Sequence, residues 1–133
     1  MKKKLYVLVM FLLLTGCSDA SKDTVYDAKQ TKEAQEVESE LDNYSDVMAY
    51  TSVLEGNDVI VSIDIQRLKR FNKEKIENKV KKYLEEKLPG KEIIVTADIK
   101  IKWELAKIID HQLQGEELNQ AIENIKSLSK EET

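Results

Sequence analysis

Few side chains in this 133-residue sequence are of the types that carry out catalysis. His111 is the only histidine, and on a helix the adjacent Asp110 would point elsewhere, so the two do not predict a general base with an orienting carboxylate. One histidine and one cysteine also fall short of a zinc site. We therefore expect His111 to be a surface or helix-end residue and the protein not to be an enzyme.

Carboxylates are abundant, but their spacing favours solvated helix faces over a catalytic pair. Glu36 and Glu40 lie one helical turn apart, whereas a hydrolase needs two carboxyl groups facing each other across a cleft. Glu55, Asn57 and Asp58 do not follow the ligand spacing of an EF-hand loop and are typical of a turn. We expect no metal and no soluble cofactor.

One segment reverses the acidic balance of the chain, whose formal net charge is −4. Its candidate residues for contact with an anionic surface are Arg67, Lys69, Arg70, Lys73 and Lys75. They could bind lipid headgroups or wall polymer. They could also form a solvated helix face interleaved with Glu74 and Glu77, which is the interpretation we favour. The overall acidity argues against nucleic acid as a partner.

Three aromatic residues, Phe71, Tyr83 and Trp103, also allow two interpretations. They could form an exposed binding platform. Because large aromatic side chains usually complete the core of a small domain, we expect them to be buried.

Cys17 is the only cysteine, and it follows a segment with the order of an export signal. Lys2, Lys3 and Lys4 precede the ten apolar residues 5–14, which as a helix span only ~15 Å, about half of a hydrocarbon core. Residues 14–17, Leu-Thr-Gly-Cys, resemble the bacterial lipobox. The resemblance implies that residues 1–16 are removed and that Cys17 receives diacylglycerol and an N-acyl lipid.

The lipidated chain would lie on the extracytoplasmic face of a cell membrane. Removal of residues 1–16 takes away three lysines and changes the formal charge from −4 to −7. We expect residues 17–30 to be a lipidated cysteine with a flexible tether, residues 31–128 a single domain and residues 129–133 a frayed tail.

Two alternating segments, residues 47–54 and 59–65, predict a β-hairpin around Gly56 and Asn57. The expected pairs are Leu54 with Val59, Ser52 with Val61, Tyr50 with Ile63, and Met48 with Ile65. This register makes one face of the hairpin almost wholly apolar. Ser62 lies on the other face, where a charge should be tolerated unless a helix covers it.

Apolar spacing predicts helices before and after this hairpin. The first carries Ala34, Val37, Leu41 and Tyr44; the strongest spans residues 72–88 and ends at Pro89 and Gly90. Residues 93–95 then predict a third strand. The stretch from Val95 to Trp103 fits either a strand or a helix, and we place the switch at Asp98 as an N-cap, with the helix ending at Gly115. A last helix carries Leu118, Ile122, Ile125 and Leu128.

The expected fold class is therefore α+β, a small antiparallel or mixed sheet of about three strands with helices on one face, in the order αββαβα. The stretch from Asp58 to Ile109 resembles the YhcN/YlaJ-type sporulation lipoproteins. The resemblance lies in the strand at 59–65, the Lys/Glu-rich helix at 73–88 and the strand with its Thr and Asp at 94–98. The chain departs from that pattern in having Asp98-Ile99 instead of Asp-Pro, and no arginine after Arg70.

The resemblance implies a non-enzymatic lipoprotein on a spore membrane, such as the spore inner membrane. It would contribute to spore assembly or germination through contacts with envelope or spore proteins. The alternative is a general cell-surface lipoprotein that binds a soluble ligand or serves as accessory subunit of a membrane complex.

Overall fold

The computed structural model describes residues 23–131. Its elements are β1 (Asp23–Asp27), α2 (Lys32–Asp42), β2 (Val47–Glu55), β3 (Asp58–Ile65), the 3-10 helix η2 (Arg67–Asn72), α3 (Lys73–Lys87), β4 (Glu92–Thr96), α4 (Ile99–Asp110) and α5 (Gly115–Glu131). The strands form one mixed sheet in the order β1-β2-β3-β4. The α+β class predicted from the sequence is confirmed.

The sheet has four strands, where about three were expected, and β1 is the additional one. It lies in residues that the sequence assigned to the tether, and it pairs in parallel with β2, Asp23 opposite Tyr50 and Asp27 opposite Leu54. Only Thr24, Val25 and Tyr26 favour a strand locally. Two further contacts stabilise the strand: its pairing with β2, and a hydrogen bond of 2.9 Å from the Tyr26 hydroxyl to the Leu113 carbonyl.

The central hairpin of β2 and β3 has the predicted register over most of its length. Leu54 lies opposite Val59, Ser52 opposite Val61 and Tyr50 opposite Ile63, and Gly56 takes the positive φ of 57° that the tight turn requires. At the far end a bulge shifts the register, so Ile65 pairs with Val47 and not with Met48. The predicted Met48–Ile65 pair is therefore wrong, and Met48 is exposed.

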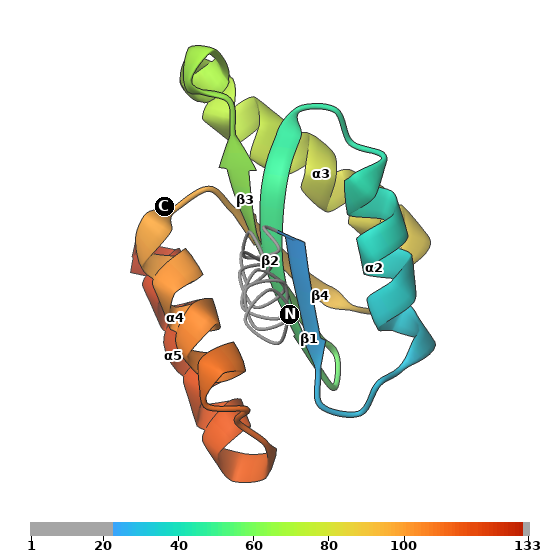
Figure 1. Cartoon of the computed structure of the whole chain (residues 1–133), viewed down its shortest axis with the longest axis vertical. Coiled ribbons are helices and arrows are strands. Elements are labelled where there is room, and N and C mark those ends of the chain that lie inside the picture. The colour runs from blue at the N-terminus through green and yellow to red at the C-terminus, as the bar shows by residue number, and fades with distance from the viewer. Residues whose placement is uncertain (1–22, 132–133) are drawn as a thin grey trace, which may run out of the picture.

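Helices cover both faces of the sheet (Figure 1). The prediction that helices pack on one face only is therefore wrong. On one face α2 and α3 pack with Val37 and Leu84 against Val61 and its neighbours. On the other, α4 and α5 pack with Leu105 and Ile122 against Val53 and Ile60. The reason is that both alternating sets of the central strands are apolar, so each face needs a cover. Two separate cores follow.

The ends of several elements follow local signals. Asp98 is the N-cap of α4, as predicted, and its Oδ1 accepts a hydrogen bond from the Lys100 amide at 2.7 Å. Helix α4 ends at Asp110 and not at Gly115, because Gln112 already turns the chain with a φ of 49°. Helix α5 continues to Glu131, through residues expected to fray. The expected signal at residues 1–16 and Cys17 lie outside the described residues.

Candidate functional site

The basic residues predicted from the sequence gather at one end of the molecule, which we call the tip. It comprises η2 and the first residues of α3, Arg67 to Lys75. Figure 1 shows this segment projecting beyond the end of β3. Helix η2 has no buried residue, so it contributes nothing to either core.

Two apolar side chains of the tip face solvent. Leu68 is 82% exposed and Phe71 is 85% exposed, the two largest exposed fractions among the large hydrophobic residues of the described part of the chain. Placing such groups in water forgoes the stabilisation that burial would bring, about 2 kcal/mol for each side chain. The prediction that Phe71 completes the core is wrong, because no helix or strand covers η2.

The base of the tip is held in place by one ion pair. Lys69 Nζ binds Asp46 Oδ1, in the loop before β2, and the Lys69 amide donates to the Gln66 carbonyl at 2.9 Å. The side chains of Arg67, Arg70 and Lys75 have no hydrogen bond or ion pair with any residue from 23 to 131. Of the basic residues predicted from the sequence, Lys69 thus stabilises the base of the tip, and its cationic neighbours face solvent.

Other exposed apolar groups lie toward the same end of the sheet as the tip; we call Met48, Ile99 and Trp103 the rim. The start of β2 lies beside the end of β3, and β4, parallel to β3, leads directly into α4. An ion pair of 2.6 Å joins Lys102 of α4 to Asp64 near the end of β3. The expected burial of Trp103 is wrong, since it is 59% exposed on the outer side of α4.

The three aromatic residues considered together in the sequence do not form one platform. Tyr83 lies in α3, on the opposite face of the sheet from α4, which carries Trp103. The Tyr83 ring packs edge-on against Tyr44, with 6.4 Å between ring centroids. Tyr83 is nevertheless 40% exposed, so its expected burial is also wrong. Leu68, Met48 and Ile99 were not singled out from the sequence, because hydrophobicity alone does not say which apolar residues stay uncovered.

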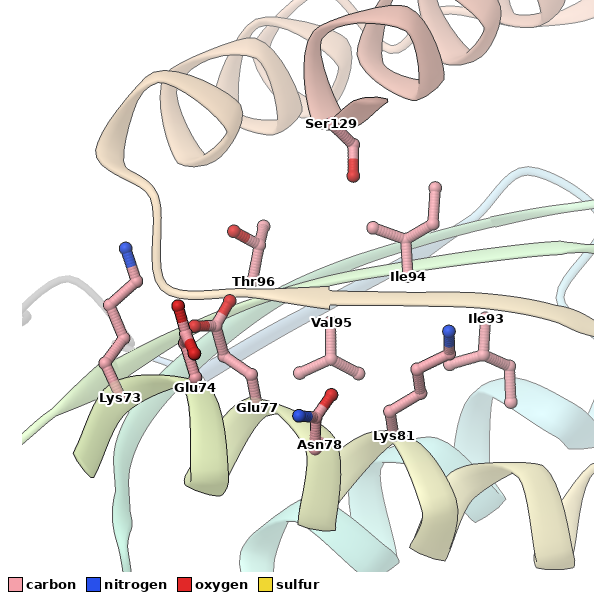
Figure 2. Close-up of a pocket in the computed structure, with 10 residues that line it drawn as sticks. All are labelled: Lys73, Glu74, Glu77, Asn78, Lys81, Ile93, Ile94, Val95, Thr96 and Ser129. Carbon is pink, nitrogen blue, oxygen red and sulfur yellow. The ribbon is translucent and has the colours of Figure 1, made fainter. Parts of the chain in front are cut away.

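A hollow of about 510 Å³ runs along the free edge of β4. In Figure 2, Val95 points toward α3, while Ile94 and Thr96 point toward Ser129 of α5. Burial raises the pKa of Glu77 above its usual range, although the Ala97 amide donates to its Oε2 at 3.3 Å. Its carboxylate therefore ties α3 to the chain after β4.

The polar groups weighed for chemistry have structural partners or face solvent. Within the described residues no cluster of three or more His, Cys, Asp or Glu could hold a metal ion. Glu55 forms an ion pair with Lys29 at 3.3 Å, and Asp58 with Lys126 at 2.7 Å. Asn57 lies in the hairpin turn and His111 is exposed at the end of α4, as expected for both.

Comparison with known proteins adds a family to this geometry. The model of the sporulation lipoprotein YhcN/YlaJ family matches residues 16–129, well beyond the segment at 58–109 that carried the resemblance. Neither curated proteins nor solved structures give a match. In the part of the chain from 23 to 131, no helix is long and apolar enough to cross a membrane. The chain belongs to the YhcN/YlaJ family of sporulation lipoproteins.

Proposed function

We propose that this sporulation lipoprotein is anchored by lipid on Cys17 to a spore membrane. There its α+β domain contributes to envelope assembly or germination through protein or envelope contacts, without catalysis. The observation that carries the proposal is the family match, which includes Cys17 and nearly the whole folded domain.

The site geometry supports a contact module over an enzyme. Glu77 has the raised pKa that an acid–base residue often shows, but its carboxylate is engaged with the backbone of Ala97. The hollow beside it lies on a strand edge and is lined by lysine, glutamate, asparagine, hydroxyl and aliphatic side chains. The hydrogen bond from the Ala97 amide leaves Glu77 acting as a link between α3 and the chain after β4.

A fluorescent protein fused to the C-terminus, imaged through growth and sporulation, tests the proposal. We expect no signal in growing cells and a ring at the membrane of the developing spore. The matched control carries residues 1–30 with the same reporter and promoter, and it separates targeting by the anchor from targeting by the domain. Constant expression in growing cells would overturn the sporulation role and favour a general surface lipoprotein.

Deletion of the gene tests the kind of contribution. We expect growth to be unchanged and germination or outgrowth to be slower, because a contact module adjusts an assembly that other proteins build. Complementation with the intact gene should restore the rate, measured as the fall in optical density after a germinant is added. A deletion strain that germinates at the normal rate and forms normal spores would contradict this role.

A further inference from the structure

The tip combines apolar and basic side chains in a way that suits a lipid surface. Leu68 and Phe71 are both largely exposed, and five basic residues but only one acidic residue, Glu74, occur from Arg67 to Lys75. Apolar groups that enter the boundary between headgroups and acyl chains, next to cations that meet lipid phosphates, are the features of interfacial membrane binding.

The exposed apolar side chains of the domain are concentrated at this end. Of six large ones in the described chain, five belong to the tip or the rim, and the sixth, Tyr83, packs against Tyr44. The rim adds Trp103, of a residue type that favours the membrane–water boundary. Such a concentration at one end is unlike the scattered apolar residues of an ordinary protein surface.

The chain enters the domain partway along the sheet, and β1 runs away from the tip end. Strand β1 begins at Asp23, opposite Tyr50, three residues after the start of β2. Cys17 precedes Asp23 by six residues, a length of at most about 20 Å when extended. A lipid on Cys17 would therefore keep the start of β1 within about 20 Å of the bilayer, so the tip end can reach the surface.

Charge fixes the orientation further. The chain without residues 1–16 carries a formal charge of −7, so an anionic bilayer repels the body of the molecule and attracts its basic end. The opposite end, where α4 meets α5, carries the acidic residues Asp110, Glu116 and Glu117.

We propose that the tip docks on the anionic bilayer that holds the lipid anchor. Leu68 and Phe71 enter the headgroup–acyl boundary, and Arg67, Arg70 and Lys75 bind lipid phosphates. This inference rests on the membrane anchoring in the proposed function and adds which end of the domain meets the lipid. The hollow along β4 and the outer faces of α2 and α5 then remain available to other molecules.

Fluorescence quenching by lipids with brominated acyl chains tests the docking. The lipidated chain with Phe71→Trp and Trp103→Phe contains one tryptophan, and it is placed in phosphatidylglycerol vesicles. We expect a blue-shifted emission and strong quenching. The matched control, His111→Trp with Trp103→Phe, places the tryptophan at the opposite end of α4 and should show neither.

Charge removal tests the role of the cations. Each basic side chain near an anionic surface strengthens binding about fivefold, so Arg67→Gln/Arg70→Gln/Lys75→Gln should weaken docking about a hundredfold. Quenching at position 71 should fall to the level of the control position. The control variant Lys29→Gln/Lys32→Gln/Lys107→Gln loses the same charge away from the tip, and its quenching at position 71 should be unchanged. Circular dichroism should show that both variants keep the fold.

The outcomes separate this inference from the proposed function. Equal quenching at both positions, or none at position 71, would overturn docking even if the fusion protein marks the spore membrane. A tip that binds wall polymer or another protein gives no quenching, because the bromines lie among the acyl chains. Strong quenching at position 71 alone supports docking even if expression proves vegetative.

Discussion

Asp27 closes the turn between β1 and α2 with three hydrogen bonds. Its Oδ1 accepts from the Lys29 amide at 2.9 Å, and its Oδ2 accepts from the Thr31 amide at 2.6 Å and the Thr31 hydroxyl at 2.5 Å. Burial alone would raise the pKa of Asp27, but these bonds favour the charged form and bring the pKa below its usual value. The same carboxylate thus ends β1 and sets the start of α2.

Asp27→Ala should lower the free energy of unfolding by about 1 kcal/mol at pH 7, because the turn loses the hydrogen bonds that the carboxylate accepts. Because the folded pKa is depressed, this stability is present above the unfolded pKa and disappears as the pH falls through the folded pKa. Urea unfolding should therefore show the two proteins converging below about pH 3. Asp110→Ala, at an exposed carboxylate, should have no such effect, and an equal effect of both changes would contradict the argument.

Ser52 presents the opposite case, a polar group without a partner. It is fully buried in β2, and its hydroxyl oxygen has no hydrogen bond among the described residues. Ser52→Ala removes the unsatisfied hydroxyl and should leave stability equal or raise it by about 1 kcal/mol, measured by urea unfolding. A loss of more than about 1 kcal/mol would show that the hydroxyl has a partner that stabilises the fold.

At the scale of elements, each part of the fold predicted from the sequence had a strong local signal. The hairpin register followed from alternation around Gly56 and Asn57, and the switch from strand to helix followed from Asp98. Strand β1 lacks such a signal, because it depends on pairing with β2, which is distant in sequence. The bulge at Met48 lacks one too, because it is a shift in the pairing of β2 with β3. The same limit explains why the exposure of Leu68 and Phe71 was not predicted.

Because helices cover the second face of the sheet, a charge at Ser62 should destabilise the fold as much as a charge at Ile63. Ile63 faces the α2/α3 core, and Ser62, 2% exposed, faces the side that α4 and α5 cover. We expect Ser62→Asp and Ile63→Asp each to cost about 3 kcal/mol or more, because both bury an unpaired carboxylate. Thermal unfolding measures the loss, with Gln66→Asp, an exposed position just after β3, as the neutral control. An unchanged melting temperature for Ser62→Asp would mean that α4 and α5 do not cover this face.

For the whole molecule, the distribution of charge and apolar surface has a direction. The acidic body and the basic tip would favour one orientation at an anionic membrane. Docking by the tip adds a second contact to that of the lipid, and two contacts hold far better than either alone. Without the lipid, the small tip alone would have to bind the membrane against the repulsion between the anionic lipids and a chain of net negative charge.

Cys17→Ala therefore tests the anchor on which this arrangement depends. Cys17 is the only cysteine, so no other thiol can accept the lipid. Cells fed radioactive palmitate should label the wild-type protein and leave the variant unlabelled, and the variant should run as an unprocessed precursor longer by residues 1–16. In a detergent phase separation the wild type should enter the detergent phase and the variant the aqueous phase. Thr15→Ser, which keeps a small residue before the cysteine, should label normally. Continued labelling of the Cys17→Ala variant would show that lipid is attached elsewhere and would remove the basis for the distance between anchor and tip.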